Sequence, residues 1–183
     1  PVFFGSALHD HGIRRLLKAL RHEAPDARAT AARVGVGTKT QPLARVFKTV
    51  HAGHAGKLSY VRVWSGEIAD GMTLNGERVG GVQRILGTKM EKLAKAEAGM
   101  VASLGRLEKA ATGDVLAAEA DAEGGLWSAP LTPLFSLAVR AHNRRDEVKL
   151  SAALSKLLDE DPSLTAELNQ DTGEYLLSGQ GEV

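Results

Sequence analysis

The sequence predicts a mainly β protein followed by a smaller α+β unit. The first observation is the stretch 47–66, in which neighbours such as Leu58 and Ser59 alternate between apolar and polar side chains with the two-residue period of a strand. The second is the recurrence of turn signals at intervals of about 8–12 residues through 42–118, which is typical of a closed or nearly closed β-barrel. The third is a change after residue 130 to mixed strand-like and helical patterns.

Length and composition restrict the class of protein. The chain has 183 residues, of which 43% are hydrophobic and 25% are charged, as in an ordinary globular protein. Its formal net charge of +1 argues against a dedicated nucleic-acid clamp. It has no cysteine, which excludes disulfide partners and thiolate chemistry and agrees with a reducing cytoplasm. No apolar run approaches the roughly 20 residues that cross a bilayer, so we expect no membrane partner.

The N-terminal residues predict a short strand and one helix. Residues 1–4 are apolar and are expected to form a buried strand. Apolar residues then recur with helical spacing from Ile13 to Leu20, and Pro25 ends this helix. No periodicity follows, so residues 26–41 are interpreted as a linker with at most one frayed turn.

Residues 42–118 are expected to form the barrel, beginning with two paired strands. The first strand covers 44–50 and the second 58–64, and the two glycines between them allow a tight reversal. Asp70-Gly71 predicts a turn, and Asn75-Gly76 is the strongest two-residue hairpin signal in the chain.

Further short strands complete the predicted barrel. One is expected near 79–86, weakened by Gly80-Gly81, and another at 100–104. The charged stretch 89–97 is interpreted as a loop, and the turn at 112–114 precedes a last strand. Five to seven strands that close on themselves would leave few exposed edges.

Residues 130–183 predict a partial ferredoxin-like unit after a linker at 119–129. A strand-like run is followed by Asn143, which is expected to cap a helix that Asp161-Pro162 ends. Two more strand-like runs lie at 164–168 and 175–177. The order β-α-β-β is two-thirds of a ferredoxin-like domain, so we expect this unit to be truncated.

No pattern in the sequence predicts a catalytic or metal site. Asp171-Thr172-Gly173 has the tripeptide of aspartic proteases, but those enzymes need two opposed carboxylates and this tripeptide occurs once. The histidine pairs, His9 with His11 and His51 with His54, have no carboxylate at ligand spacing. A phosphate-binding loop and a nucleophile elbow are both absent from these residues.

Several short strings nevertheless occur together in a familiar order. They are GSAL at 5–8, FK at 47–48, GKL at 56–58, RVWSG at 62–66, ATGDVL at 111–116, EDP at 160–162, and TGE at 172–174 with LSGQGE at 177–182. In this order they resemble bacterial elongation factor G or a close paralogue, a family of translational GTPases. Gln180, where this family is expected to have methionine, and the stretch 142–149 depart from its pattern.

The resemblance implies that the chain contains parts of three domains. Residues 1–25 would be the end of a GTP-binding domain, 42–118 the barrel of the second domain, and 130–183 part of the third. It implies that Ser6, Ala7 and Leu8 lie on the guanine side of a nucleotide site. The phosphate loop and the Mg-holding residues of the family would precede residue 1. We therefore expect no cofactor in this segment, and GTP with Mg in the longer protein.

The resemblance further implies a non-catalytic, ribosome-facing role in translocation, driven by GTP hydrolysis elsewhere in the protein. Its partners would be ribosomal RNA and small-subunit proteins. Candidate RNA contacts are basic residues expected at exposed strand ends and loops. They are Lys57, Arg62, Arg78 and Arg84 in the barrel, and Arg140, Arg144 and Arg145 in the third domain. A ribosomal-protection or release-type relative, and a stand-alone β-barrel interaction module, remain alternatives.

Overall fold

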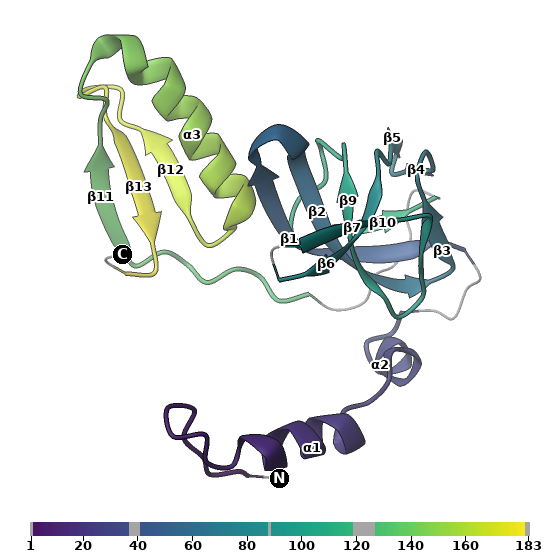
Figure 1. Cartoon of the computed structure of the whole chain (residues 1–183). Helices are drawn as coiled ribbons and strands as arrows, with labels where there is room; N and C mark the ends of the chain where they lie inside the picture. Colours follow the sequence, from purple (N-terminus) through teal and green to yellow (C-terminus); the bar gives the residue numbers. More distant parts are fainter. Residues whose placement is uncertain (1, 37–40, 88, 119–126, 182–183) are drawn as a thin grey trace.

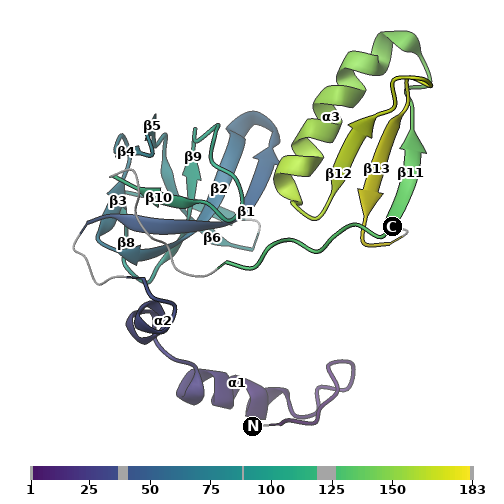
Figure 2. The ribbon, with the colours of Figure 1, turned by 180° about the vertical axis from the view of Figure 1, so that it is seen from behind.

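The computed structural model describes residues 2–36, 41–87, 89–118 and 127–181. In chain order these residues form a helical N-terminal segment, a β-barrel and a three-stranded sheet with one helix (Figure 1). The view from behind shows the same three parts, with the N-terminal helices below the barrel and the three-stranded unit beside it (Figure 2). The predicted fold class, a β-barrel followed by part of an α+β domain, is confirmed.

The N-terminal segment contains two helices, α1 (Ile13–Glu23) and α2 (Ala27–Arg33). The expected strand at its start is wrong: Val2 is 83% exposed and Phe4 is 92% exposed, and neither lies in a strand. Among residues 2–36, the only pairing is the single bridge between Ser6 and His11. The apolar run has no strand beside it to cover it, so it stays on the surface.

Helix α2 corrects, for residues 27–33, the interpretation of residues 26–41 as a linker with at most one frayed turn, while residues 37–40 lie outside the described residues. Asp26 is its N-cap, and Oδ1 accepts a hydrogen bond of 2.7 Å from the Ala29 N–H. Ala31 and Val36 are buried against Leu43 and Ala117 of the barrel. One cap and one small apolar cluster therefore position this short helix. The helix was not predicted because its Ala- and Arg-rich sequence has no apolar residues at helical spacing.

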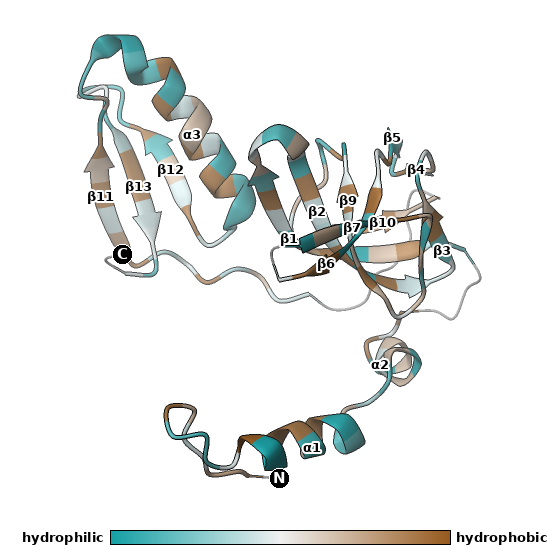
Figure 3. Cartoon of the chain, viewed as in Figure 1, coloured by the Kyte–Doolittle hydropathy of each residue, from teal (hydrophilic) through white to brown (hydrophobic). Residues whose placement is uncertain are grey.

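Helix α1 has one apolar stripe that remains on the surface. Leu16, Leu17 and Leu20 are 40%, 58% and 55% exposed, respectively. Helix α1 carries brown, hydrophobic bands between hydrophilic ones (Figure 3). Within the described residues, the stripe therefore has no apolar partner that buries it.

The barrel begins with the predicted long hairpin. Strand β1 (Leu43–Ala52) is antiparallel to β2 (Gly56–Ser65), and a 3-10 turn, η1 (Gly53–Ala55), joins them. Gly53 and Gly56 have positive φ angles of 34° and 70°, so the turn uses the backbone freedom that the two glycines provide.

Eight more strands occur in the described parts of the barrel, residues 41–87 and 89–118, so these residues alone exceed the five to seven strands expected. They are β3 (Glu67–Ala69), β4 (Thr73–Leu74), β5 (Glu77–Arg78), β6 (Val82–Leu86), β7 (Lys89–Leu93), β8 (Lys95–Glu97), β9 (Val101–Gly105) and β10 (Val115–Ala117). The largest sheet has the order β10-β1-β2-β9-β6-β7, and β3 pairs with β8 and β4 with β5.

The charged stretch 89–97 is not a loop, contrary to the prediction. It forms β7 and β8, and β7 pairs with β6 in continuous register from Val82 opposite Leu93 to Leu86 opposite Lys89. Both strands lie at the barrel surface, where Lys and Glu side chains remain solvated while the backbone pairs. Charge at edge strands is a common protection against further pairing.

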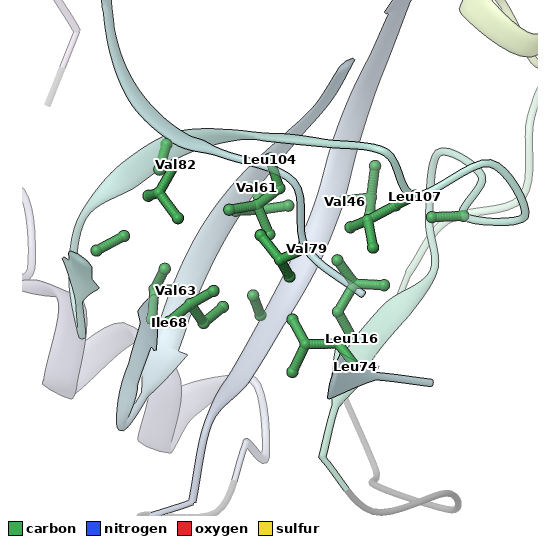
Figure 4. Close-up of a cluster of buried hydrophobic side chains, with 14 residues drawn as sticks. Val46, Val61, Val63, Ile68, Leu74, Val79, Val82, Leu104, Leu107 and Leu116 are labelled. Carbon is green, nitrogen blue, oxygen red and sulfur yellow. The ribbon is translucent and has the colours of Figure 1, made fainter. Parts of the chain in front are cut away.

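The core of the barrel is a cluster of fourteen buried apolar residues (Figure 4). Val61 and Val63 of β2 point into it, together with Val46 of β1 and Leu104 of β9. Tyr60, Arg62 and Trp64 alternate with these valines and are half-buried on the outer face. The alternation that predicted the strand therefore also divides its inner face from its outer face.

The last part of the chain forms a second, smaller unit. Its elements are β11 (Phe135–Val139), a 3-10 turn η2 (Arg144–Asp146), α3 (Glu147–Glu160), β12 (Thr165–Leu168) and β13 (Tyr175–Gly179). The antiparallel sheet has the order β11-β13-β12. The Asn143 side chain makes no capping hydrogen bond, contrary to the prediction, because η2 intervenes before α3 begins.

Candidate functional site

Four residues join the barrel to the helix of the second unit. His51 and Lys57 belong to the first hairpin, and Asp159 and Glu160 lie in the last turn of α3. The lower end of α3 lies beside this hairpin in both views (Figures 1 and 2). We call these four residues the latch.

The latch is built from three short polar contacts across the junction. Asp159 Oδ2 lies 3.1 Å from His51 Nε2 and 3.2 Å from Lys57 Nζ. The backbone N–H of His51 donates a hydrogen bond of 2.5 Å to Glu160 Oε1. Two adjacent carboxylates of one helix therefore receive three contacts from one hairpin.

The local fold explains why these groups meet. His51 and Lys57 are directly opposite each other in the antiparallel pair β1–β2, so their side chains project from the same face. Asp159 and Glu160 are consecutive residues at the end of α3. Each pair is thus placed within its own element, and the junction brings the two pairs together.

Lys57 is the most buried member of the latch. Its side chain is 5% exposed, whereas that of Asp159 is 43% exposed. Its ammonium group also donates a hydrogen bond of 2.8 Å to the Glu108 carbonyl, so it has a partner in the barrel as well as one across the junction. A buried charge requires such partners because leaving it unpaired is costly.

The two partners of Asp159, His51 and Lys57, lower the pKa of its carboxyl group. Partial burial raises the pKa of this carboxyl, but hydrogen bonds from His51 and Lys57, with their Coulombic attraction, outweigh it. The pKa of Asp159 is therefore lowered from its ordinary value of 3.8. The carboxylate form, which is the form that holds the latch, is the favoured one.

The end of α3 indicates that these acidic residues serve the junction and not the helix. The negative end of a helix dipole favours cations, yet the last turn of α3 has no basic residue. Asp159, Glu160 and Asp161 follow one another there. Sequence reasoning missed the latch, and this run of acidic residues at a helix C-terminus was the signal that could have found its acidic half.

Comparison with known proteins explains the two-part architecture. Residues 42–119 match the family model for elongation factor G domain 2, and residues 131–183 match the model for elongation factor G, domain III. The chain carries domains II and III of an elongation factor G-like protein. The latch is thus a contact between domains II and III.

The relatives are considerably longer than this chain. The chain is 43% identical to the elongation factor G-like protein of Synechocystis over 185 aligned residues, which cover all of it and 27% of that relative. It is 30% identical to elongation factor G of Dehalococcoides mccartyi, and covers 29% of that protein. The chain thus spans just over a quarter of the length of these curated relatives.

A solved structure agrees with the arrangement. A crystal structure of a protein from Thermus thermophilus superposes with a TM-score of 0.75 at 31% sequence identity. The match covers 93% of this chain and 26% of the other. Nearly the whole elongation factor G-like segment therefore has a counterpart of the same general shape.

Lys57 does not fit the surface role that was predicted for it. It was expected to be an exposed RNA contact, but its ammonium group is buried between the Glu108 carbonyl and Asp159. The correction has a physical reason: a lysine stem can lie along an apolar surface while its ammonium reaches a partner within the protein. Sequence alone shows the charge and not where it points.

The other predicted RNA contacts are distributed over both domains. Arg62 is half-buried and its guanidinium lies 5.7 Å from the centre of the Trp64 ring. Arg78 in β5 and Arg84 in β6 are exposed. Exposed basic residues of domain III gather near the N-terminal end of α3, the opposite end from the latch (Figure 1). They are Arg140, Arg144 and Arg145.

The three residues implied for the guanine side lie in a small surface loop. Ser6 and His11 exchange two backbone hydrogen bonds of 3.0 Å, and Ser6 Oγ accepts one of 3.3 Å from the His9 N–H. Ala7 and Leu8 are exposed, Leu8 to 88%. The loop is therefore ordered by its own backbone, and its role toward guanine stays a prediction.

The described residues contain no group of three or more His, Asp or Glu side chains placed to hold a metal ion. Their helices also include none with the length and apolar character that crossing a bilayer requires.

Proposed function

We propose that this segment acts in ribosomal translocation as a non-catalytic, ribosome-facing part of an elongation factor G-like GTPase. In this role domains II and III move as bodies when GTP hydrolysis relaxes another domain of the longer protein. The observation that supports it most directly is the latch, because it joins domain III to domain II through polar contacts. Such contacts can break and re-form without unfolding either body.

GTP and Mg would belong to the longer protein. The exposed stripe of α1 supports the proposal that residues 1–25 pack on a GTP-binding domain, since a helix normally buries such a face. Ser6, Ala7 and Leu8 would complete the guanine side there. The isolated chain should then show no GTP binding in the micromolar range and no GTP hydrolysis. Calorimetry that detected tight GTP binding by this chain would contradict this part of the proposal.

The decisive experiment uses the longer protein with ribosomes. We expect ribosome-stimulated GTP hydrolysis, and movement of tRNA and mRNA after hydrolysis. Lys57→Met should slow that movement while leaving the hydrolysis rate nearly unchanged, because it weakens the latch and touches no nucleotide. Lys95→Met is the matched control, since Lys95 pairs with Glu67 and Glu97 within the barrel. Absence of any ribosome-stimulated hydrolysis would overturn the proposal.

A second function is favoured by one comparison. The Synechocystis relative, at 43% identity, is named elongation factor G-like, whereas the Dehalococcoides elongation factor G shares 30%. A specialised relative of the translocase, such as a ribosomal-protection or release-type factor, agrees with this difference. Such a relative would hydrolyse GTP on ribosomes but fail to replace elongation factor G in moving tRNA and mRNA.

A further inference from the structure

The barrel has a surface hollow that is separate from the latch. It lies where the turn after β3, strand β5 and the residue after β9 come together, and its volume is about 450 Å³. Its lining consists of two arginines, one acidic residue, two glycines and a valine. They are Arg78, Arg106, Asp70, Gly71, Gly80 and Val79.

The two glycines make room for the two arginine side chains. A Cβ added to Gly80 would lie 2.2 Å from Cδ and 2.5 Å from Cγ of Arg106, so the Arg106 stem occupies the space of a missing side chain. A Cβ added to Gly71 would lie 3.3 Å from Arg78 Nη2. Both arginines therefore lie close against backbone, and the hollow is shaped by residues with no side chain.

Arg106 is held in an unusual backbone conformation. Its φ angle is +61°, in the left-handed region that residues other than glycine seldom adopt. Two hydrogen bonds fix the adjoining backbone: the Gly80 N–H donates to the Gly105 carbonyl at 2.9 Å, and the Gly105 N–H donates to the Gly81 carbonyl at 3.2 Å. Strain of this kind is commonly retained where a side chain must point at a ligand.

Neither guanidinium group is neutralised within the described residues, where Arg78 and Arg106 have no ion pair and no hydrogen-bond acceptor. The nearby acids have backbone partners. Asp70 Oδ1 accepts a hydrogen bond of 2.9 Å from the Gly81 N–H, and the Glu77 carboxylate accepts from the Lys109 N–H at 3.1 and 3.2 Å. The lining thus has two cations and one anion.

We propose that this hollow binds a phosphate group between Arg78 and Arg106. Two guanidinium groups from different segments line the hollow, and a phosphate has more acceptor oxygens to receive their donors than a carboxylate has. The phosphate belongs either to a small molecule or to the backbone of an RNA strand. This inference does not depend on the proposed role of the latch, and a test of one leaves the other unchanged.

The experiment is a titration of the whole chain with inorganic phosphate, followed by backbone amide resonances. We expect saturable shifts at Gly71, Gly80 and Gly81, and smaller ones elsewhere. Arg78→Gln and Arg106→Gln should each weaken phosphate binding by about tenfold, because each removes a charge-assisted donor pair. Arg84→Gln, which removes an exposed arginine of the same barrel, should leave the affinity unchanged.

Gly80→Ala tests the geometry without changing the charge. The φ angle of Gly80 lies outside the left-handed range, so alanine is not strained by it, but the added Cβ would lie 2.2, 2.5 and 2.9 Å from Cδ, Cγ and Cβ of Arg106. The Arg106 side chain and its adjoining backbone must therefore both shift. We expect this variant to bind phosphate as weakly as Arg106→Gln. Asp70→Asn should instead bind more tightly, since it removes the negative charge of the lining. Unchanged binding in Gly80→Ala, or no saturable shift with wild type, would overturn the proposal.

A second titration with a short single-stranded RNA distinguishes the two sources of the phosphate. An RNA backbone is identified if the RNA shifts the amide resonances of the same glycines at a lower concentration than inorganic phosphate does. These shifts should also be weakened by Gly80→Ala. If inorganic phosphate shifts these amides and the RNA does not, the ligand is a small phosphorylated molecule. If the RNA shifts only residues outside the hollow, the RNA source is rejected.

Discussion

At the scale of single residues, Lys57 shows how burial changes the role of a cation. Its stem lies within the protein, and its ammonium group contacts a carbonyl of the barrel and a carboxylate of domain III. An exposed ion pair contributes about 0–1 kcal/mol, whereas a buried one fixes geometry because its partners are few. Lys57 is therefore expected to determine orientation more than overall stability.

Replacing Lys57 by methionine should loosen the junction without unfolding either domain. Methionine keeps much of the apolar stem but removes the ammonium group, so Asp159 loses one of its two partners. We expect a broader distribution of distances between spin labels placed on domains II and III, measured by pulsed electron resonance. Lys95→Met should leave the distribution unchanged. A distribution in Lys57→Met as narrow as in wild type would show that the latch does not set the orientation.

The acidity of Asp159 gives a second test at this scale. Its pKa is lowered in the docked state, so its contribution to docking is complete above the ordinary value of 3.8 and is lost as the pH falls through the lowered value. In Lys57→Met the pKa should move back toward 3.8, as followed by carboxyl resonances. Asp161 serves as an internal control, because its pKa is lowered by hydrogen bonds from Ser163 and not by the latch.

At the scale of elements, the hairpin β4–β5 follows directly from its turn sequence. Thr73 pairs with Arg78 and Leu74 with Glu77, so Asn75 and Gly76 form a two-residue loop. Their φ angles are +48° and +79°, as that loop requires. The Asn75 side chain also donates a hydrogen bond of 2.6 Å to the Val115 carbonyl and accepts one of 3.0 Å from the Ala117 N–H, which ties the loop to β10.

Gly76→Ala should lower the free energy of unfolding of the barrel by about 1–2 kcal/mol, the usual cost of a left-handed conformation. The cost is purely one of backbone strain, since an added Cβ would meet nothing within 4 Å. Gly76→Asn is the control: asparagine tolerates this conformation, so it should cost less than alanine. Chemical denaturation of both variants measures the difference. Equal losses for both would mean that strain is not the cause.

The elements that could be predicted are those with a local cause. Alternation at 58–64, the Asn75-Gly76 turn and the stop at Pro162 all act within a few residues, and each is found in the structure. Strand β7 was not predicted because its charged sequence lacks the alternating apolar pattern of a strand, and it is held in place by backbone pairing with β6. The latch was missed because His51 and Asp159 are brought together only by the packing of two domains.

At the scale of the whole molecule, the two domains differ sharply in buried apolar content. The barrel has a cluster of fourteen buried apolar residues, whereas Leu154 is the only buried apolar side chain between residues 127 and 181. Because burial of apolar surface is the main source of stability, domain III of this chain should open locally more often than the barrel.

Hydrogen exchange should separate the two domains. Amides of β13 are expected to exchange faster than those of β2, and Leu154→Ala should remove protection from domain III alone, since it costs about 2–5 kcal/mol where little else is buried. Protection in the barrel should persist. Simultaneous loss of protection in β2 and β13 would show that the two domains unfold as one unit.

Neither of the two buried apolar clusters found among the described residues spans the junction, whereas the charges and hydrogen bonds of the latch do. Counterions reach this pair mainly from the side of Asp159, which is 43% exposed, because the Lys57 side chain is only 5% exposed and buried charges are screened less than exposed ones. Dissolved salt should therefore increase how often domain III leaves domain II, but by less than it would for a fully exposed ion pair.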